Sequence, residues 1–220
     1  ICELYIGLVL VATAGTTLST CVIFTRLAGG DEALALWISV CSSLLSVALT
    51  AALLFLLLGE TVAVPVGMLM RRLLLVLFVP LSAGMLLRRL LGERLLAPLG
   101  PALTRSCTAI VLAVIVVAVA NGREVLAGLD SLRILAVSAA FHLAMLRLWR
   151  GSAAAVSYGR ERRIAVLFTS AEKTMQIPIY LAISVLAVPG AGVVPVAHHV
   201  IQLVADSLIA SYYGSGEENA

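Results

Sequence analysis

Long uninterrupted apolar runs dominate this chain and limit what it can fold into. Leu49–Leu58 and Ile110–Ala120 contain no charged residue and do not alternate between apolar and polar positions. Inside a bilayer the backbone must satisfy its own hydrogen bonds, so a span is an α-helix or a strand of a closed barrel. Barrel strands alternate between lipid-facing and lumen-facing residues. We therefore predict an all-α fold, a polytopic transmembrane helix bundle.

Seven apolar segments approach the length of about 20 residues that a helix needs to cross the hydrocarbon core. They are Tyr5–Thr25, Ala33–Leu58, Val66–Leu87, Leu103–Ala120, Ile134–Leu148, Ile164–Val188 and Val193–Tyr213. Of the 220 residues, 61% are hydrophobic and 12% are charged, whereas soluble domains average about 25% charged residues. The connections are too short for a soluble domain. Residues 1–220 are thus predicted to form one transmembrane domain that contacts the lipid bilayer.

The arginines are divided unevenly between the two sides that alternating segments define. The connections after the first, third and fifth segments hold ten of them, and the opposite connections hold four. Short arginine-rich loops stay in the cytoplasm, so these connections and the C-terminus are expected there, and no nucleic-acid partner is expected. Arg71 and Arg72 interrupt the third segment. We interpret Val62–Arg72 as an interfacial lead-in helix; the alternative is a third segment that starts later and is short.

The first segment contains a cluster of small polar residues inside an apolar span. The cluster comprises Thr13, Gly15, Thr16, Thr17, Ser19 and Thr20. Such a stretch can unwind, and unwound backbone at membrane depth is where transporters coordinate substrates and ions. Alternatively, the hydroxyls bond to carbonyls of the preceding turn and help the helices pack. In the second segment, Ser39 or Ser43 can add an oxygen to a cage for a hard cation, although close packing explains these serines most simply.

The sixth segment is interrupted more clearly, because Thr169–Pro178 holds two charges, an amide and a proline. Each centrally placed charge costs roughly 2.5 to 3.5 kcal/mol on insertion scales. Lys173 is the only lysine in the chain. Pro178 lacks a backbone donor and opposes a continuous helix. The alternative is a loop up to Thr169 and a helix that starts near Met175, which leaves about a dozen residues to span the membrane.

The two interrupted segments lie five segments apart, as expected when a five-helix unit is repeated with inverted topology. Residues 1–58 are then the end of the first repeat, and residues 59–220 are the second repeat. About three helices are expected to precede Ile1, so we predict that the chain is truncated at its start.

The seventh segment has a polar face, because His199, Gln202 and Asp206 recur at helical spacing beside His198. Hydrogen bonding between helices and a proton relay or substrate contact are both compatible with this face. His142, near the end of the fifth segment, is interpreted as structural.

Two stretches resemble the bile acid:sodium symporter superfamily, especially its SBF-like branch. They are Gly15–Thr20 followed by Thr25–Leu36, and Ser170–Gln176. The resemblance implies a ten-helix inverted-repeat transporter fold in which the fourth and ninth helices are broken and cross at the binding site. About seven of those helices are then present here. It also implies a location in the inner (plasma) membrane of a bacterium.

The resemblance further implies ion-binding residues. Carried over to this sequence, the sodium ligands would be Glu172 and Gln176, with oxygens from Ser19, Thr20 and Ser39. Thr20 stands where the symporters usually have asparagine. Lys173 stands directly beside Glu172, and we hypothesise that its ammonium group substitutes for at least one sodium ion.

These observations predict a secondary transporter of a small organic anion that works by alternating access, with Na⁺ as a candidate coupling ion and no other cofactor. The substrate is expected to contact Thr16, Thr17, Thr174 and Pro178. The sequence shows no HExxH or GxSxG pattern, so no enzyme is predicted. The alternative is a non-transporting membrane regulatory or scaffold protein that retains the transporter fold.

Overall fold

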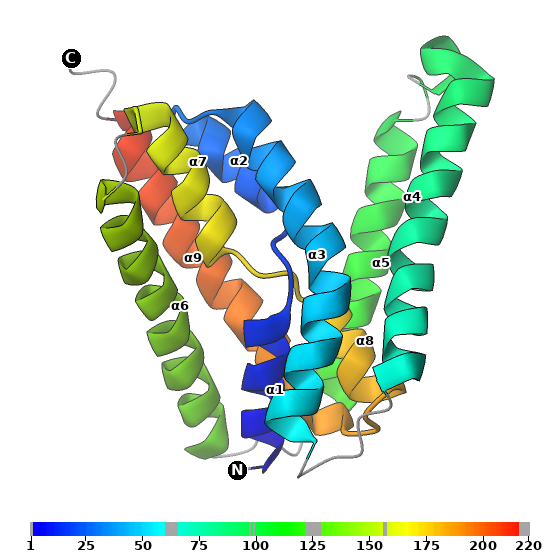
Figure 1. Ribbon diagram of the computed structural model, residues 1–220, viewed down its shortest axis with the longest axis vertical. Helices are drawn as coiled ribbons and strands as arrows, with labels where there is room; N and C mark the ends of the chain where they lie inside the picture. Colours follow the sequence, from blue (N-terminus) through cyan, green and yellow to red (C-terminus); the bar gives the residue numbers. More distant parts are fainter. Residues whose placement is uncertain are drawn as a thin grey trace.

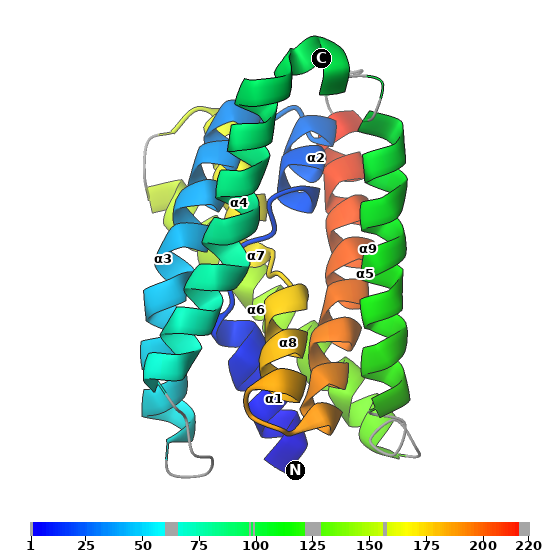
Figure 2. The same ribbon diagram turned by 90° about the vertical axis from the view of Figure 1, so that its right-hand side faces the viewer.

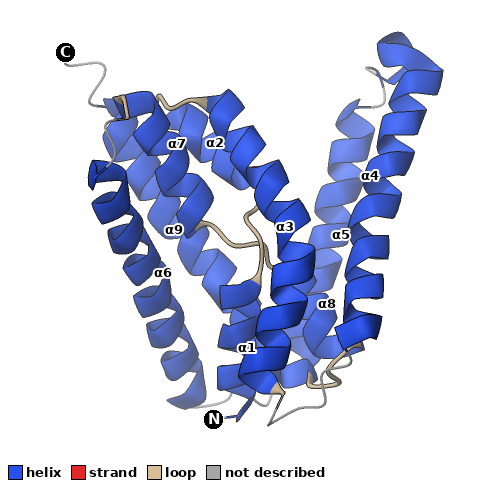
Figure 3. Ribbon diagram, viewed as in Figure 1, coloured by secondary structure: helices blue, strands red, loops and turns tan. Residues whose placement is uncertain are grey.

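The computed structural model describes residues 2–59, 66–96, 98, 100–121, 129–155 and 158–215. Over these ranges the regular elements are helices and no strand is present (Figure 3), which confirms the all-α prediction. The elements are α1 (Cys2–Thr13), α2 (Thr20–Leu27), α3 (Glu32–Leu58), α4 (Val66–Leu96), α5 (Gly100–Asn121), α6 (Leu129–Ala155), α7 (Arg160–Ala171), α8 (Gln176–Ser184), the short 3₁₀ helix η2 (Pro189–Gly192) and α9 (Val193–Ser215).

Each predicted apolar segment coincides with a helix or a pair of helices. The first segment is divided into α1 and α2 and the sixth into α7 and α8, while the other five each correspond to one long helix. Four stretches of the described chain are long and apolar enough to cross a membrane: Glu32–Leu58, Met70–Gly92, Ser131–Trp149 and Pro189–Ser215. A multi-pass membrane protein is therefore supported.

The helices run alternately up and down the molecule (Figures 1 and 2). In the view of Figure 1, α1 begins at the bottom, and α2, α4, α6 and α9 all end at the top. The helix ends beside the arginine-rich connections therefore share one end of the molecule with the end of α9. This is the alternation on which the predicted orientation depends.

The helix α1 lies inside the bundle, where it packs against α3, α8, η2 and α9. Ile6 and Leu10 of α1 are fully buried with Leu54 and Leu181. A Cβ atom at Gly7 would lie 2.5 Å from Cγ2 of Val194. Glycine thus permits the close approach of α1 to α9, as is common where helices pack in membranes.

The turn between α2 and α3 is fixed by local hydrogen bonds. Gly29 has a φ of 69°, a left-handed value that glycine adopts without strain. The amide of Gly30 donates to the carbonyl of Thr25 at 2.8 Å. Asp31 then caps α3, because its side chain accepts from the amide of Leu34 at 2.9 Å. This turn holds the start of α3 beside the end of α2.

The helix α4 differs from the prediction at its start. It is continuous from Val66 through Arg71 and Arg72, so a separate lead-in helix that ends at Arg72 is not present. Arg72 is accommodated because its guanidinium donates to the carbonyl of Ser184, at the end of α8, at 2.8 Å. Residues 62–65 of the predicted lead-in helix lie outside the described residues.

Candidate functional site

Two interruptions in the helices lie at the centre of the candidate site. The chain is non-helical between Thr13 and Thr20, and again between Ala171 and Gln176. Pro178 lies in the first turn of α8, where its missing N–H is not needed. The alternative was wrong to place a loop up to Thr169, because α7 covers Arg160–Ala171. Its helix start near Met175 is confirmed, because α8 begins at Gln176.

The two interruptions are hydrogen-bonded to each other. The amide of Thr174 donates to the carbonyl of Gly15 at 2.9 Å, and the hydroxyl of Thr16 donates to the carbonyl of Thr169 at 2.6 Å. Backbone that leaves a helix inside a bilayer must find other partners. Here each interruption supplies partners for the other.

Hydroxyl groups of α3 form hydrogen bonds with further backbone groups of the first interruption. The hydroxyl of Thr50 donates to the carbonyl of Thr13 at 2.6 Å, and the amide of Thr16 donates to the hydroxyl of Ser42 at 3.2 Å. Ser39, a predicted ion ligand, is instead bonded to Cys21 at 2.9 Å and to the carbonyl of Ala35 at 2.8 Å. Its hydroxyl is therefore engaged within α2 and α3.

Glu172 is fully buried at the second interruption. Its Oε2 atom accepts hydrogen bonds from the hydroxyls of Thr17 and Thr20. Its Oε1 atom has no hydrogen-bond partner within the part of the chain that the structure describes. A buried carboxylate oxygen without a donor is an unusual and costly arrangement, and it makes this oxygen a candidate ligand for a cation or a proton.

Lys173 points away from Glu172. The backbone of Glu172 is extended (φ −75°, ψ 138°), so α7 ends there and Lys173 does not continue its helical path. No ion pair between the two residues is found among the described side chains. The ammonium group of Lys173 instead donates to the carbonyl of Ala14 at 3.4 Å. It therefore lies at the C-terminal end of α1, the end of a helix that attracts positive charge.

A cavity of about 360 Å³, which we call the polar cavity, adjoins both interruptions. Its lining residues are Thr16, Thr17, Leu18, Ser19, Thr20, Ser43, Thr174, Gln176, Ile177 and His199. Six predicted site residues are thus brought together: Thr16, Thr17, Ser19, Thr20, Thr174 and Gln176. Glu172 lies behind the wall that Thr17 and Thr20 form, whereas Ser39, Lys173 and Pro178 do not line the cavity.

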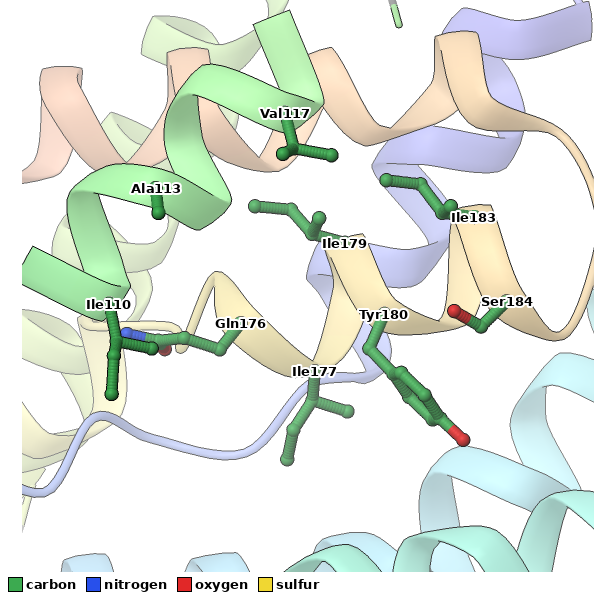
Figure 4. A pocket seen from close by; sticks show the side chains of 9 residues that line it. All are labelled: Ile110, Ala113, Val117, Gln176, Ile177, Ile179, Tyr180, Ile183 and Ser184. Carbon is green, nitrogen blue, oxygen red and sulfur yellow. The ribbon is translucent and has the colours of Figure 1, made fainter.

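A second, larger cavity, which we call the apolar cavity, lies between α5 and α8 (Figure 4) and has a volume of about 590 Å³. Ala113 and Val117 of α5 face Ile179 and Ile183 of α8 across it. The cavity also contacts Gln176 and Ile177, which line the polar cavity as well. This cavity could not be predicted from the sequence, because apolar residues that line a cavity have the same pattern as residues that face lipid.

The polar face of α9 is divided between two environments. His198, Gln202 and Asp206, spaced four residues apart, are buried, whereas His199 is half-buried and lines the polar cavity. His142, which we interpreted as structural, lies 3.0 Å from Asp206 and has a charged partner that its isolated position did not indicate. Within the described residues no group of three or more His, Cys, Asp or Glu is arranged to hold a metal ion.

Comparison with known proteins supports the resemblance seen in the motifs. The SBF-like CPA transporter family matches the chain over residues 2–215. The search of curated proteins found no match. The family match includes both interruptions and every residue that lines the two cavities.

Proposed function

The chain belongs to the SBF-like CPA transporter family, a part of the bile acid:sodium symporter superfamily, and on that premise we propose that it is a secondary transporter of small organic anions. The family supports a membrane transporter rather than an enzyme. The substrate class, the coupling ion and alternating access are parts of the proposal, and each is supported by particular contacts.

The proposed substrate site is the polar cavity, and one observation carries its preference for anions. Thr20 and Gln176, the first residues of α2 and α8, both line it. A helix N-terminus carries about half a positive charge and unsatisfied N–H groups. Within the described residues, the side chains of Ser19 and Met175 do not cap these helices. Two helix N-termini thus open onto one cavity and favour an anionic group.

The adjoining apolar cavity supports a substrate with a nonpolar part. It shares Gln176 and Ile177 with the polar cavity, so one molecule can contact both. In this proposal the anionic group contacts Thr16, Thr17 and Thr174. Pro178 lies in the first turn of α8, where it favours the start of this helix beside the cavity, and it does not contact the substrate directly.

The proposed mechanism is alternating access around two broken spans that cross. The pairs α1–α2 and α7–α8 are the candidates for these spans, and the bonds that join their interruptions support this assignment. Residues 1–58 and 59–220 would then belong to two inverted repeats of a ten-helix fold. We place the chain in the inner membrane with its C-terminus in the cytoplasm, as the positive-inside rule predicts.

The proposed coupling involves one internal and one exchangeable cation. The ammonium group of Lys173 at the carbonyl of Ala14 takes the position of one sodium ion. The exchangeable ion binds near Oε1 of Glu172, with Ser19, Thr20 and Gln176 as further candidate ligands; Ser39 can join them only if it leaves Cys21 and Ala35. In the present conformation Gln176 Oε1 accepts from the hydroxyl of Thr174 at 2.7 Å.

The test begins with the purified chain in detergent and a panel of organic anions that includes bile acids. Each anion is tested for a rise in melting temperature with sodium and with choline as the cation. Anions that stabilise the protein are then followed as uptake into proteoliposomes. We expect uptake that persists, at least in part, when choline replaces sodium. A complete loss of uptake without sodium would refute the role of Lys173.

Variants at Glu172 test the position of the site. Glu172→Gln is expected to abolish uptake, because it removes the buried carboxylate whose Oε1 atom is the proposed ligand of the exchangeable cation. The matched control is Glu161→Gln, which changes an exposed carboxylate of α7 and is expected to retain uptake. Full activity of Glu172→Gln would show that Glu172 lies outside the site.

The alternative function is that of a membrane regulator or scaffold without transport. The threonine at position 20 and the lysine at position 173 favour it, because both depart from the symporter pattern. A folded protein that binds none of the anions and transports none would support this alternative over the transporter.

A further inference from the structure

A buried pair of titratable residues lies outside the cavity that the transport proposal uses. The ring Nε2 of His142, on α6, lies 3.0 Å from Oδ1 of Asp206, on α9, and both side chains are fully buried. The two helices run side by side (Figure 1). Nδ1 of His142 and Oδ2 of Asp206 have no hydrogen-bond partner among the described residues. Each residue of the pair therefore has one more atom that can form a hydrogen bond.

Aromatic rings enclose the pair on one side. The rings of His142 and His198 meet edge to face with centroids 5.6 Å apart, and the rings of Phe141 and His198 do so with centroids 5.5 Å apart. Hydrophobic surroundings of this kind strengthen an electrostatic interaction and penalise an uncompensated charge.

Gln202, on the same helix as Asp206, is hydrogen-bonded to the interruption between α7 and α8. It lies one turn before Asp206 on the same face of α9, and both are fully buried. Its Oε1 atom accepts from the amide of Lys173 at 2.7 Å, and its Nε2 atom has no partner within the described ranges.

With Glu172 and Asp206 ionised, Lys173 protonated and the imidazoles neutral, the groups around the pair carry one net negative charge. The nearby titratable groups are His198 and His199 on α9, and Glu172 and Lys173 at the interruption. Among the ionisable side chains of the other packed helices whose exposure the structure describes, the thiol of Cys21 on α2 is buried. The others are half-buried or exposed: Glu3, Tyr5, Arg26, Arg105, Arg133, Arg147, Tyr180 and Arg160–Arg163. Two carboxylates and one ammonium group sum to one negative charge when the imidazoles are neutral. One proton on the pair removes this charge when no exchangeable cation is bound near Glu172.

We propose that His142 and Asp206 form a buried proton-binding site that balances the charge at the interruption between α7 and α8. The proton is shared between Nε2 of His142 and Oδ1 of Asp206, and Gln202 links the site to the backbone of Lys173. The site is separate from the cavity and its existence does not depend on which anion is transported.

The experiment uses the full chain in lipid nanodiscs with ¹⁵N-labelled histidine. The chain has only three histidines, so the single variants His198→Gln and His199→Gln assign the spectrum. The ring nitrogens are followed between about pH 5 and pH 8, the range in which histidine titrates. We expect His142 to change its protonation or its tautomer within this range. A fixed neutral tautomer of His142 throughout would overturn the proposal, because a purely structural hydrogen bond has no reason to change with pH.

The variant Asp206→Asn then tests the role of the carboxylate. It keeps the shape of the side chain and is expected to remove the change at His142, while His199 is unaffected. A His142 titration that survives in Asp206→Asn contradicts a shared proton. If Asp206→Asn does not fold, Asp206→Glu is used, and the wild-type titration remains decisive. A pH-electrode measurement of acid uptake in weak buffer, with Glu161→Gln as the control, is expected to show one fewer proton per chain in Asp206→Asn.

Discussion

The backbone amide of Thr174 and the backbone carbonyl of Gly15 are joined by a hydrogen bond of 2.9 Å. This bond links an interruption near the start of the chain to one near its end, and it does not depend on either side chain. Neither interruption can become helical without breaking it, because both groups would then be needed inside their own helices. The two interruptions therefore form one structural unit.

Thr17→Val is expected to destabilise the protein by about 1.5 to 3 kcal/mol, the usual contribution of a hydrogen bond to a charged group. Valine keeps the shape of threonine but leaves Glu172 with one donor fewer. The control is Thr25→Val, since the hydroxyl of Thr25 is buried without a partner among the described residues. That variant is expected to be as stable as the wild type or slightly more so. Thermal unfolding in detergent compares the two, and equal losses would argue against the bond to Glu172.

Gly7→Ala is expected to cost about 1 to 3 kcal/mol through overpacking. Its Cβ would lie 2.7 Å from the carbonyl oxygen of Ala191, and backbone cannot move aside cheaply. Gly84→Ala is the matched control, because a Cβ there meets nothing within 4 Å. That change is expected to stabilise α4 by about 0.5 to 1 kcal/mol. Similar melting temperatures for the two variants would contradict the close approach of α1 to α9.

Lys173→Met is expected to make the protein sodium-dependent. The substitution removes the ammonium group from the carbonyl of Ala14 and leaves room for an ion at the C-terminal end of α1. Sodium is then expected to raise the melting temperature of the variant more than that of the wild type, with choline as the reference cation. The same response in both proteins would show that Lys173 does not take the position of an ion.

Gln202→Leu is expected to destabilise the interruption between α7 and α8 by about 1 to 3 kcal/mol, because it leaves the amide of Lys173 buried without an acceptor. Ser207→Ala, an exposed change on the same helix, serves as the control. Hydrogen exchange of the amides at residues 172–175 is the measurement. Unchanged protection in Gln202→Leu would remove Gln202 from the proposed link.

The orientation is tested with C-terminal reporter fusions. A green fluorescent protein fused to the C-terminus is expected to be fluorescent, and an alkaline phosphatase in the same position is expected to be inactive, since the first reporter folds in the cytoplasm and the second requires an oxidising compartment. The opposite result would reverse the arginine-based assignment.

The sequence predicted the helices and their interruptions because both depend on local composition. Apolar runs specify α3 and α9, and the charges and proline near Glu172 are too costly for a continuous span in lipid. The continuity of α4 through Arg72 was missed, since it relies on the carbonyl of Ser184, which is distant in the chain. The divergence of Glu172 and Lys173 depends on one extended residue, which adjacency in sequence does not reveal.

The partnership of His142 with Asp206 was also beyond local reasoning. Each residue is recognisable as a buried polar group, but their contact depends on how α6 packs on α9. The repeat organisation of residues 1–58 and 59–220 stays a prediction, as do the ten-helix fold and the helices expected before Ile1.

Gln176 and Ile177 line both the polar cavity and the apolar cavity. A substitution at either position changes the size of both cavities. Selectivity for the anionic group and selectivity for the nonpolar part of the substrate therefore cannot evolve independently at these two positions. Substitutions of Ala113 or Val117 on α5 change only the apolar cavity, so selectivity for the nonpolar part of the substrate can change there independently.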